Sequence, residues 1–154
     1  MKITLKFLAV LFFVSVCLNS NSAIAKRAAI IINYDTQEVL FEVNADTLNY
    51  PASLAKIMTL YIVFDYLDKN KLSWKTKMKV SEIAASRSRS KLYLEKDSSI
   101  NVKDAVMALI VKSANDVATV IAEHIAGTER DFAKLMTKYA KQIGMNKTTF
   151  KNAS

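Results

Sequence analysis

The sequence predicts an α/β (α+β) fold in which a β-hairpin precedes a mainly helical region. The runs Ala28–Tyr34 and Gln37–Val43 are rich in strand-forming residues, and Asp35-Thr36 between them is typical of a turn. After a polar connection, the apolar run Leu54–Leu67 is long enough for about four turns of helix. Because this run is apolar on nearly every face, we expect its helix to be enclosed by the rest of the protein.

Three further helices are indicated downstream by capping residues and helical spacing. Asn101 is a suitable N-cap for a helix over 102–111, and a second helix is expected over 116–126. A third lies between Thr128, which can cap its start, and Gly144, which can end it. The chain has no internal repeat and no linker that marks a second domain.

The region between the first two predicted helices is less regular. Residues 69–99 are interpreted as loops with a short helix over 81–85, and a short extended piece is expected over 148–150. The basic run 86–91 is either a solvated loop or a contact surface for an anionic glycan or lipid, and we favour the solvated loop.

The first 25 residues resemble a signal peptide. Lys2 and Lys6 form a positive start, residues 7–18 are apolar, and Ala23-Ile24-Ala25 offers a small-x-small cleavage site. The apolar run is shorter than the roughly 20 residues that a membrane-spanning helix needs. Lipoprotein processing at Cys17 is the alternative, which the bulky residue before that cysteine disfavours.

Export would leave residues 26–154, which contain no cysteine and therefore no disulfide framework. The formal charge of +8 would fall to about +6 after loss of the leader. A basic surface favours anionic partners such as cell wall or lipid, or serves solubility alone. No nucleic-acid motif is present. His124 is the only histidine, and we interpret it as structural. The sequence therefore offers no cluster of metal ligands.

The strongest chemical signal is Ser53 followed three residues later by Lys56. On a helix these side chains share one face, so the amine can reach the hydroxyl. A serine needs a base to become a nucleophile, and a lysine can act as that base when burial lowers its pKa. We therefore interpret Ser53 as a nucleophile and Lys56 as its general base. The simpler alternative makes Ser53 a helix N-cap and Lys56 a surface residue.

A second polar pair, Ser113 and Asn115, lies in a short break between two apolar helices. Ser113 can relay a proton to a leaving amine, and Asn115 can bind a substrate amide carbonyl and hold Lys56. Similar pairs occur at Ser88–Lys91 and Ser99–Asn101. The first lacks an apolar helix that would desolvate its lysine, and the second is explained by helix capping.

Together these motifs resemble those of the penicillin-binding, serine-type D-alanyl-D-alanine carboxypeptidase family. The likeness is carried by Pro51-Ala-Ser-Leu-Ala-Lys56 and by Lys112-Ser-Ala-Asn-Asp116, in the order the family has them. The segments Asn33-Tyr-Asp35, Glu42-Val-Asn-Ala-Asp46 and Gly144-Met-Asn-Lys-Thr-Thr-Phe150 extend it.

The resemblance implies a DD-peptidase fold of the β-lactamase-like transpeptidase class. It implies that Ser53 is acylated by the penultimate D-alanine carbonyl of a peptidoglycan pentapeptide, and that β-lactams acylate the same serine. It also implies no metal and no cofactor, and action in the periplasm or on the envelope side of the cytoplasmic membrane.

One family motif has no match here. The family's K-T-G or H-T-G strand is absent, since Lys75-Thr76 is followed by Lys77 and Lys147-Thr148 by Thr149. In the family this strand binds the substrate carboxylate and supplies an oxyanion donor, whose loss costs about 10²–10³ in rate. We therefore expect residues 26–154 to be the N-terminal portion of the catalytic domain, incomplete in its sheet, in either a truncated form or a split form with a complementing C-terminal fragment.

Three functions remain open on this basis. The first is a DD-carboxypeptidase whose truncated or split form has little activity alone. The alternative is a non-catalytic remnant, or a fragment that binds β-lactam or muropeptide weakly. A β-lactamase relative is disfavoured because no acidic deacylation loop is evident.

Overall fold

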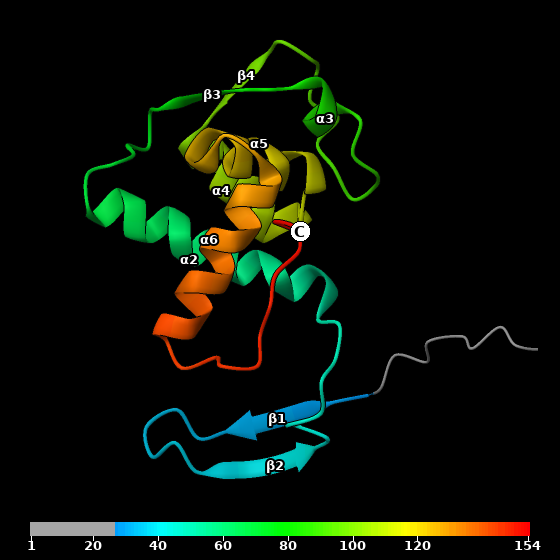
Figure 1. The fold of residues 1–154 in the computed structure, drawn as a ribbon, viewed down its shortest axis with the longest axis vertical. Helices are drawn as coiled ribbons and strands as arrows, with labels where there is room; N and C mark the ends of the chain where they lie inside the picture. The colour runs from blue at the N-terminus through cyan, green and yellow to red at the C-terminus, as the bar shows by residue number, and fades with distance from the viewer. Residues whose placement is uncertain (1–26) are drawn as a thin grey trace, which may run out of the picture. The chain divides into compact units, whose positions relative to one another are not determined.

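The computed structural model describes residues 27–154, so the predicted signal peptide over 1–25 lies outside the described residues. The chain divides into two compact units, one ending at Tyr50 and the other spanning Pro51–Ser154. Figure 1 shows the elements along the chain.

The first unit contains the predicted hairpin. Strands β1 (Ala29–Ile32) and β2 (Val39–Val43) pair antiparallel, with Ala29 opposite Val43 and a bulge after Ile31. The Asn33 side chain accepts the backbone N–H groups of Asp35 and Thr36 at 2.9 and 3.0 Å, which closes the turn. Every residue of both strands is exposed.

The second unit begins with the predicted helix. A single 3-10 turn, η1 (Ala52–Leu54), leads into α2 (Ala55–Asp68). The expectation that this helix is enclosed on every side was wrong. Its inner face is buried, but the apolar side chains of Ile57, Tyr61 and Phe64 are exposed, as is that of Leu54 in the preceding turn. An apolar run shows which faces can be buried, whereas burial also needs a partner for each face.

The remaining helices follow the capping signals closely. They are α3 (Glu82–Ala85), α4 (Val102–Lys112), α5 (Asn115–Ala126) and α6 (Glu129–Gln142). Asn101 and Thr128 accept backbone N–H groups as the N-caps of α4 and α6. Gly127 ends α5 at a φ of 77°, a value that glycine adopts without steric cost.

Two short strands in the irregular region were not predicted. Strands β3 (Lys77–Lys79) and β4 (Ser99–Asn101) pair antiparallel, with Met78 opposite Ile100. Each has three residues and one buried side chain, which is too little for an alternating pattern to be visible in the sequence. No strand forms over 148–150.

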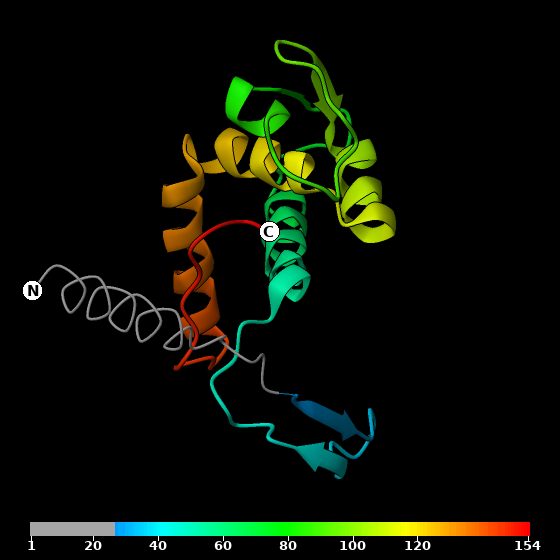
Figure 2. The ribbon, with the colours of Figure 1, turned by 90° about the vertical axis from the view of Figure 1, so that its right-hand side faces the viewer.

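The core of the second unit lies around α5, whose residues 116–122 are all buried. α5 contacts α2, α3, α4, α6 and β3. α2 contacts α6, and Figure 1 shows these two helices crossing, while Figure 2 shows α5 lying across the upper end of α6. The largest fully buried side chains come from different elements and interlock here: Phe132, Ile62, Met78, Ile121 and Met136. This packing fixes the helices that carry both sequence motifs.

No helix among residues 27–154 combines the length and apolar character needed to cross a membrane.

Candidate active site

Ser53 and Lys56 lie together at the start of the α2 helix. Ser53 is in the 3-10 turn and exposed, while Lys56 is the second residue of α2 and only 4% exposed. The Lys56 Nζ donates to Ser53 Oγ at 3.5 Å, at the long end of the hydrogen-bond range. Catalytic contacts are often long before substrate binds. The spacing therefore brings the predicted nucleophile and base together.

The burial of Lys56 has an electrostatic consequence. Desolvation lowers the pKa of its amine below the usual 10.5, because the charged form loses water. None of the ion pairs among residues 27–154 includes Lys56, so no carboxylate counteracts this effect. A larger fraction of this amine is neutral near neutral pH than for an exposed lysine, as a general base requires.

The backbone before the nucleophile is strained. Ala52 has a φ of 49°, in the left-handed region that disfavours residues with a Cβ. Such a conformation costs about 1 kcal/mol or more, and strain of this kind concentrates at functional sites.

Ser113 and Asn115 form the junction between α4 and α5. Ser113 ends α4 at a φ of 54°, also left-handed, and Asn115 begins α5. The two residues are therefore held on a tight turn between two packed helices. α2 contacts both α4 and α5, so this turn and the Ser53–Lys56 pair belong to one helical unit.

The side chain of Asn115 is fixed by a neighbouring loop. Its Nδ2 donates to the carbonyls of Ser88 and Arg89 at 3.2 and 3.1 Å, and its backbone N–H donates to Ser90 at 2.7 Å. Ser90 in turn donates its hydroxyl to the carbonyl of Lys112 at 2.7 Å. Within residues 27–154, no hydrogen bond joins Ser113 or Asn115 directly to the Ser53–Lys56 pair. The predicted role of Asn115 in holding Lys56 stays a prediction.

The two similar sequence pairs have structural roles. Lys91 donates to the carbonyl of Ala85 at 3.0 Å and lies over the ring of Tyr93, so it does not serve Ser88. Asn101 caps α4 and accepts the N–H of Asp104 at 2.8 Å. Tyr93, which follows the first of these pairs, is 57% exposed, and its ring lies beside Lys91 and Lys112.

Sequence reasoning missed Asp116, which follows Asn115 and is fully buried. Its carboxylate accepts the backbone N–H groups of Leu92 and Leu94 at 3.0 and 3.2 Å, and that of Val117 at 2.9 Å. Asp116 therefore fastens the loop that runs beside Asn115. The signal available was an acidic residue at the head of an otherwise apolar helix.

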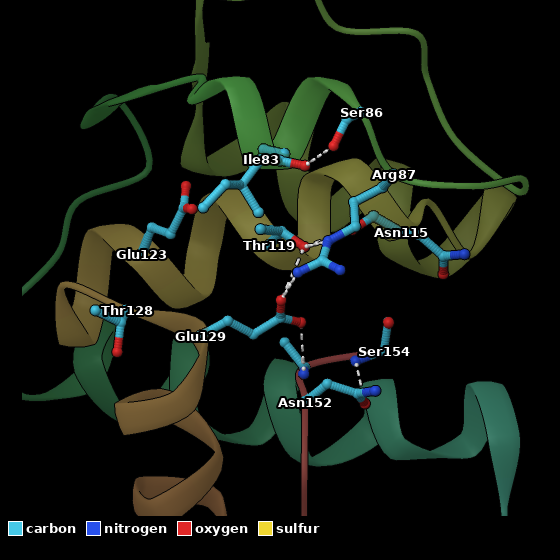
Figure 3. Close-up of polar contacts among 12 residues, drawn as sticks. Ile83, Ser86, Arg87, Asn115, Thr119, Glu123, Thr128, Glu129, Asn152 and Ser154 are labelled. Atoms are coloured by element: carbon cyan, nitrogen blue, oxygen red, sulfur yellow. Dashed lines mark hydrogen bonds and ion pairs between the residues drawn. The ribbon is translucent and has the colours of Figure 1, made fainter.

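A second missed feature is a polar cluster beside this loop, shown in Figure 3. Arg87 pairs with Glu129 at the start of α6 and donates from Nε to Thr119 Oγ1 at 2.9 Å. No local sequence pattern links residues so far apart. An open hollow lies next to Arg87 and Glu129, but Ser53, Lys56, Ser113 and Asn115 do not line it.

No group of three or more histidine, cysteine or acidic side chains within 27–154 is arranged to hold a metal ion. The chemistry available from the described site is that of a serine, a desolvated amine, a second hydroxyl and an amide.

Comparison with known proteins places this arrangement in a family context. The family described as D-alanyl-D-alanine carboxypeptidase matches residues 16–154. The D-alanyl-D-alanine carboxypeptidase DacF of Bacillus subtilis is 38% identical over 126 residues, which make up 82% of this chain and 32% of that protein.

Solved structures agree with the sequence comparison. The carboxypeptidase DacD of Francisella tularensis superposes with a TM-score of 0.79 at 36% identity, over 88% of this chain and 36% of that one. Penicillin-binding protein D2 of Listeria monocytogenes, solved in its cefotaxime-bound form, gives 0.71 at 35% identity, over 82% and 51%. The chain thus spans about a third of the length of the curated relatives it matches.

Proposed function

Because the chain belongs to the D-alanyl-D-alanine carboxypeptidase family, we propose that it carries the acylating half of a serine DD-peptidase site. The substrate is the D-alanyl-D-alanine end of a peptidoglycan pentapeptide, and β-lactams are covalent inhibitors. The observation that carries the proposal is the buried amine of Lys56 in contact with the exposed hydroxyl of Ser53. No metal or cofactor takes part.

The proposed reaction begins with neutral Lys56, which accepts the Ser53 proton as Oγ attacks the penultimate D-alanine carbonyl carbon. The tetrahedral intermediate collapses when its C–N bond breaks, and Ser113 relays a proton to the departing amine of the terminal D-alanine. Asn115 binds a substrate amide carbonyl through an Nδ2 N–H, which exchanges the loop carbonyl of Ser88 or Arg89 for the carbonyl of the substrate. Water then attacks the Ser53 ester, which releases the shortened peptide and restores the hydroxyl. The N-terminus of α2 favours the negative charge that develops near Ser53.

Benzylpenicillin provides the direct test of this acylation. Incubation of the folded chain should add the mass of one intact penicillin, and peptide mapping should place it on Ser53. Ser53→Ala should remove the adduct, whereas Ser99→Ala, at an exposed serine of β4, should retain it. A folded protein without an adduct, or an adduct on another residue, would contradict the proposal.

We propose that efficient hydrolysis of the pentapeptide depends on parts of the family's domain that lie outside residues 27–154. Two observations support this: the K-T-G motif has no match here, and the hairpin and one face of α2 expose apolar side chains. A two-stranded sheet with open edges can accept further strands. A complementing C-terminal fragment would supply these strands and the second oxyanion donor.

This dependence predicts slow release of D-alanine from a pentapeptide by the 154-residue chain alone. Its rate should lie about 10²–10³-fold below that of full-length DacF of Bacillus subtilis, because one oxyanion donor is missing. Release can be measured with a coupled D-amino acid oxidase assay. A rate equal to that of DacF would contradict the dependence. Acylation without any release would instead favour the alternative function, a β-lactam- or muropeptide-binding remnant.

We also propose that the protein acts on the envelope side of the cytoplasmic membrane. The proposal is supported by the sequence of residues 1–25, which resembles a signal peptide, and by the cell-wall substrate that the site chemistry suits.

A further inference from the structure

Glu129 lies at the start of α6, and its carboxylate binds two different segments of the chain. One oxygen pairs with the Arg87 guanidinium, and the other accepts the backbone N–H of Ala153 at 3.1 Å. Figure 3 shows the contact between Glu129 and Arg87. The Glu129 side chain is 12% exposed, so water competes little for these bonds, and charge-assisted bonds in such surroundings are stronger than surface ion pairs.

Arg87 is linked to Asn115 by two sets of contacts. Through space, its Nε donates to the Thr119 hydroxyl, which donates to the Asn115 carbonyl at 3.3 Å. Along the chain, the next two residues are Ser88 and Arg89, whose carbonyls accept the Asn115 side-chain amide. The orientation of Asn115 therefore depends on a loop that Arg87 ties to Glu129.

The same carboxylate also connects to the helix of the nucleophile. Ala153, whose N–H binds Glu129, accepts the hydroxyl of Thr59 on its carbonyl at 2.7 Å. Thr59 is fully buried and lies three residues after Lys56, on the same face of α2. Glu129 is thus the point at which hydrogen bonds from both motif segments meet, although those segments share no direct hydrogen bond among the described residues.

We propose that Glu129 is a positioning residue that sets the orientation of Asn115 through Arg87. This inference rests on the proposed function, in which Asn115 binds an amide carbonyl of the substrate. Loss of the carboxylate charge would release Arg87 and loosen residues 88–90. Asn115 would then present its amide in several orientations, and only ligands that use this amide would be affected.

Two β-lactams separate this role from general loss of structure. Benzylpenicillin carries a side-chain amide carbonyl next to its ring, whereas 6-aminopenicillanic acid has a free amine there. In Glu129→Gln, acylation of Ser53 by benzylpenicillin should fall about tenfold, since small misplacements of binding groups cost this much or more. Acylation by 6-aminopenicillanic acid should stay within about twofold of the parent chain. Arg87→Lys should show the same selective loss.

The matched control is Glu123→Gln on α5, which accepts a bond from Ser81 at 3.0 Å and lies outside these contacts. It should leave both acylation rates unchanged. Equal losses toward both β-lactams in Glu129→Gln, or no loss toward benzylpenicillin, would overturn the positioning role.

A second readout does not depend on acylation. In nuclear magnetic resonance spectra, the Asn115 side-chain amide protons should exchange faster with water in Glu129→Gln than in the parent chain and in Glu123→Gln. Unchanged exchange would overturn the proposal even if Ser53 proves unreactive. Conversely, faster exchange in a chain that forms no adduct would support the positioning contact while removing the proposed function, so the two failures are distinguishable.

Discussion

Replacement of Lys56 with methionine is expected to slow acylation of Ser53 by benzylpenicillin by about 10²–10⁴-fold. Methionine fills a similar volume but cannot accept the serine proton. The amine of Lys56 is the base within hydrogen-bond reach of Ser53 Oγ among the described residues. The second-order acylation rate, followed by intact-protein mass spectrometry, measures the effect.

The matched control is Lys91→Met, at the lysine of the second S-x-x-K pair, which donates to the Ala85 carbonyl. Its acylation rate should stay within about twofold of the parent chain, as is usual for changes outside a reacting site. A Lys56→Met chain that reacts at the parental rate would show that another group activates Ser53.

Lys56→Met should slow acylation but should increase the stability of the folded chain. Burial lowers the pKa of Lys56 in the folded state, so below 10.5 the unfolded chain binds more protons at this residue than the folded chain. Stability from this residue therefore rises with pH up to about 10.5 and is lowest when the amine is charged. Lys56→Met should raise the free energy of unfolding near pH 7 by about 1 kcal/mol. In urea denaturation, this advantage should shrink as the pH approaches 10.5.

Asp116→Ala is expected to destabilise the second unit by about 2–4 kcal/mol of unfolding free energy. Asp116 is fully buried, and its two oxygens accept backbone N–H groups from Leu92, Leu94 and Val117. Alanine would leave these donors unpaired and create a small cavity. Chemical denaturation of the two chains measures the difference.

Asp68→Ala provides the comparison, because Asp68 is an exposed residue at the end of α2. It should change stability by no more than about 0.5 kcal/mol. If Asp116→Ala costs as little as Asp68→Ala, the carboxylate does not hold the 92–94 loop.

Structural features that depend on residues close together in the sequence were predictable. Asn101 and Thr128 cap their helices as expected, because a cap needs only a side chain and an N–H three residues on. The Ser53–Lys56 contact is of the same kind, since it follows from helical spacing. The desolvation of Lys56 was predicted from the apolar run around it.

Features that join distant segments were not predictable. Arg87 and Glu129 are far apart in the chain, and nothing in their local sequence indicates that they pair. Pairing of β3 with β4 depends on one buried side chain in each strand. The exposed face of α2 was mispredicted because hydrophobicity does not reveal whether a covering element is present.

The amine beside Ser53 can act as a base because burial desolvates it. Titration of the Lys56 side chain, labelled at Cε and followed by nuclear magnetic resonance, measures this directly. We expect a pKa of Lys56 clearly below 10.5, and a pH profile of Ser53 acylation whose rise has the same midpoint. A Lys56 pKa at or above 10.5 would contradict this expectation.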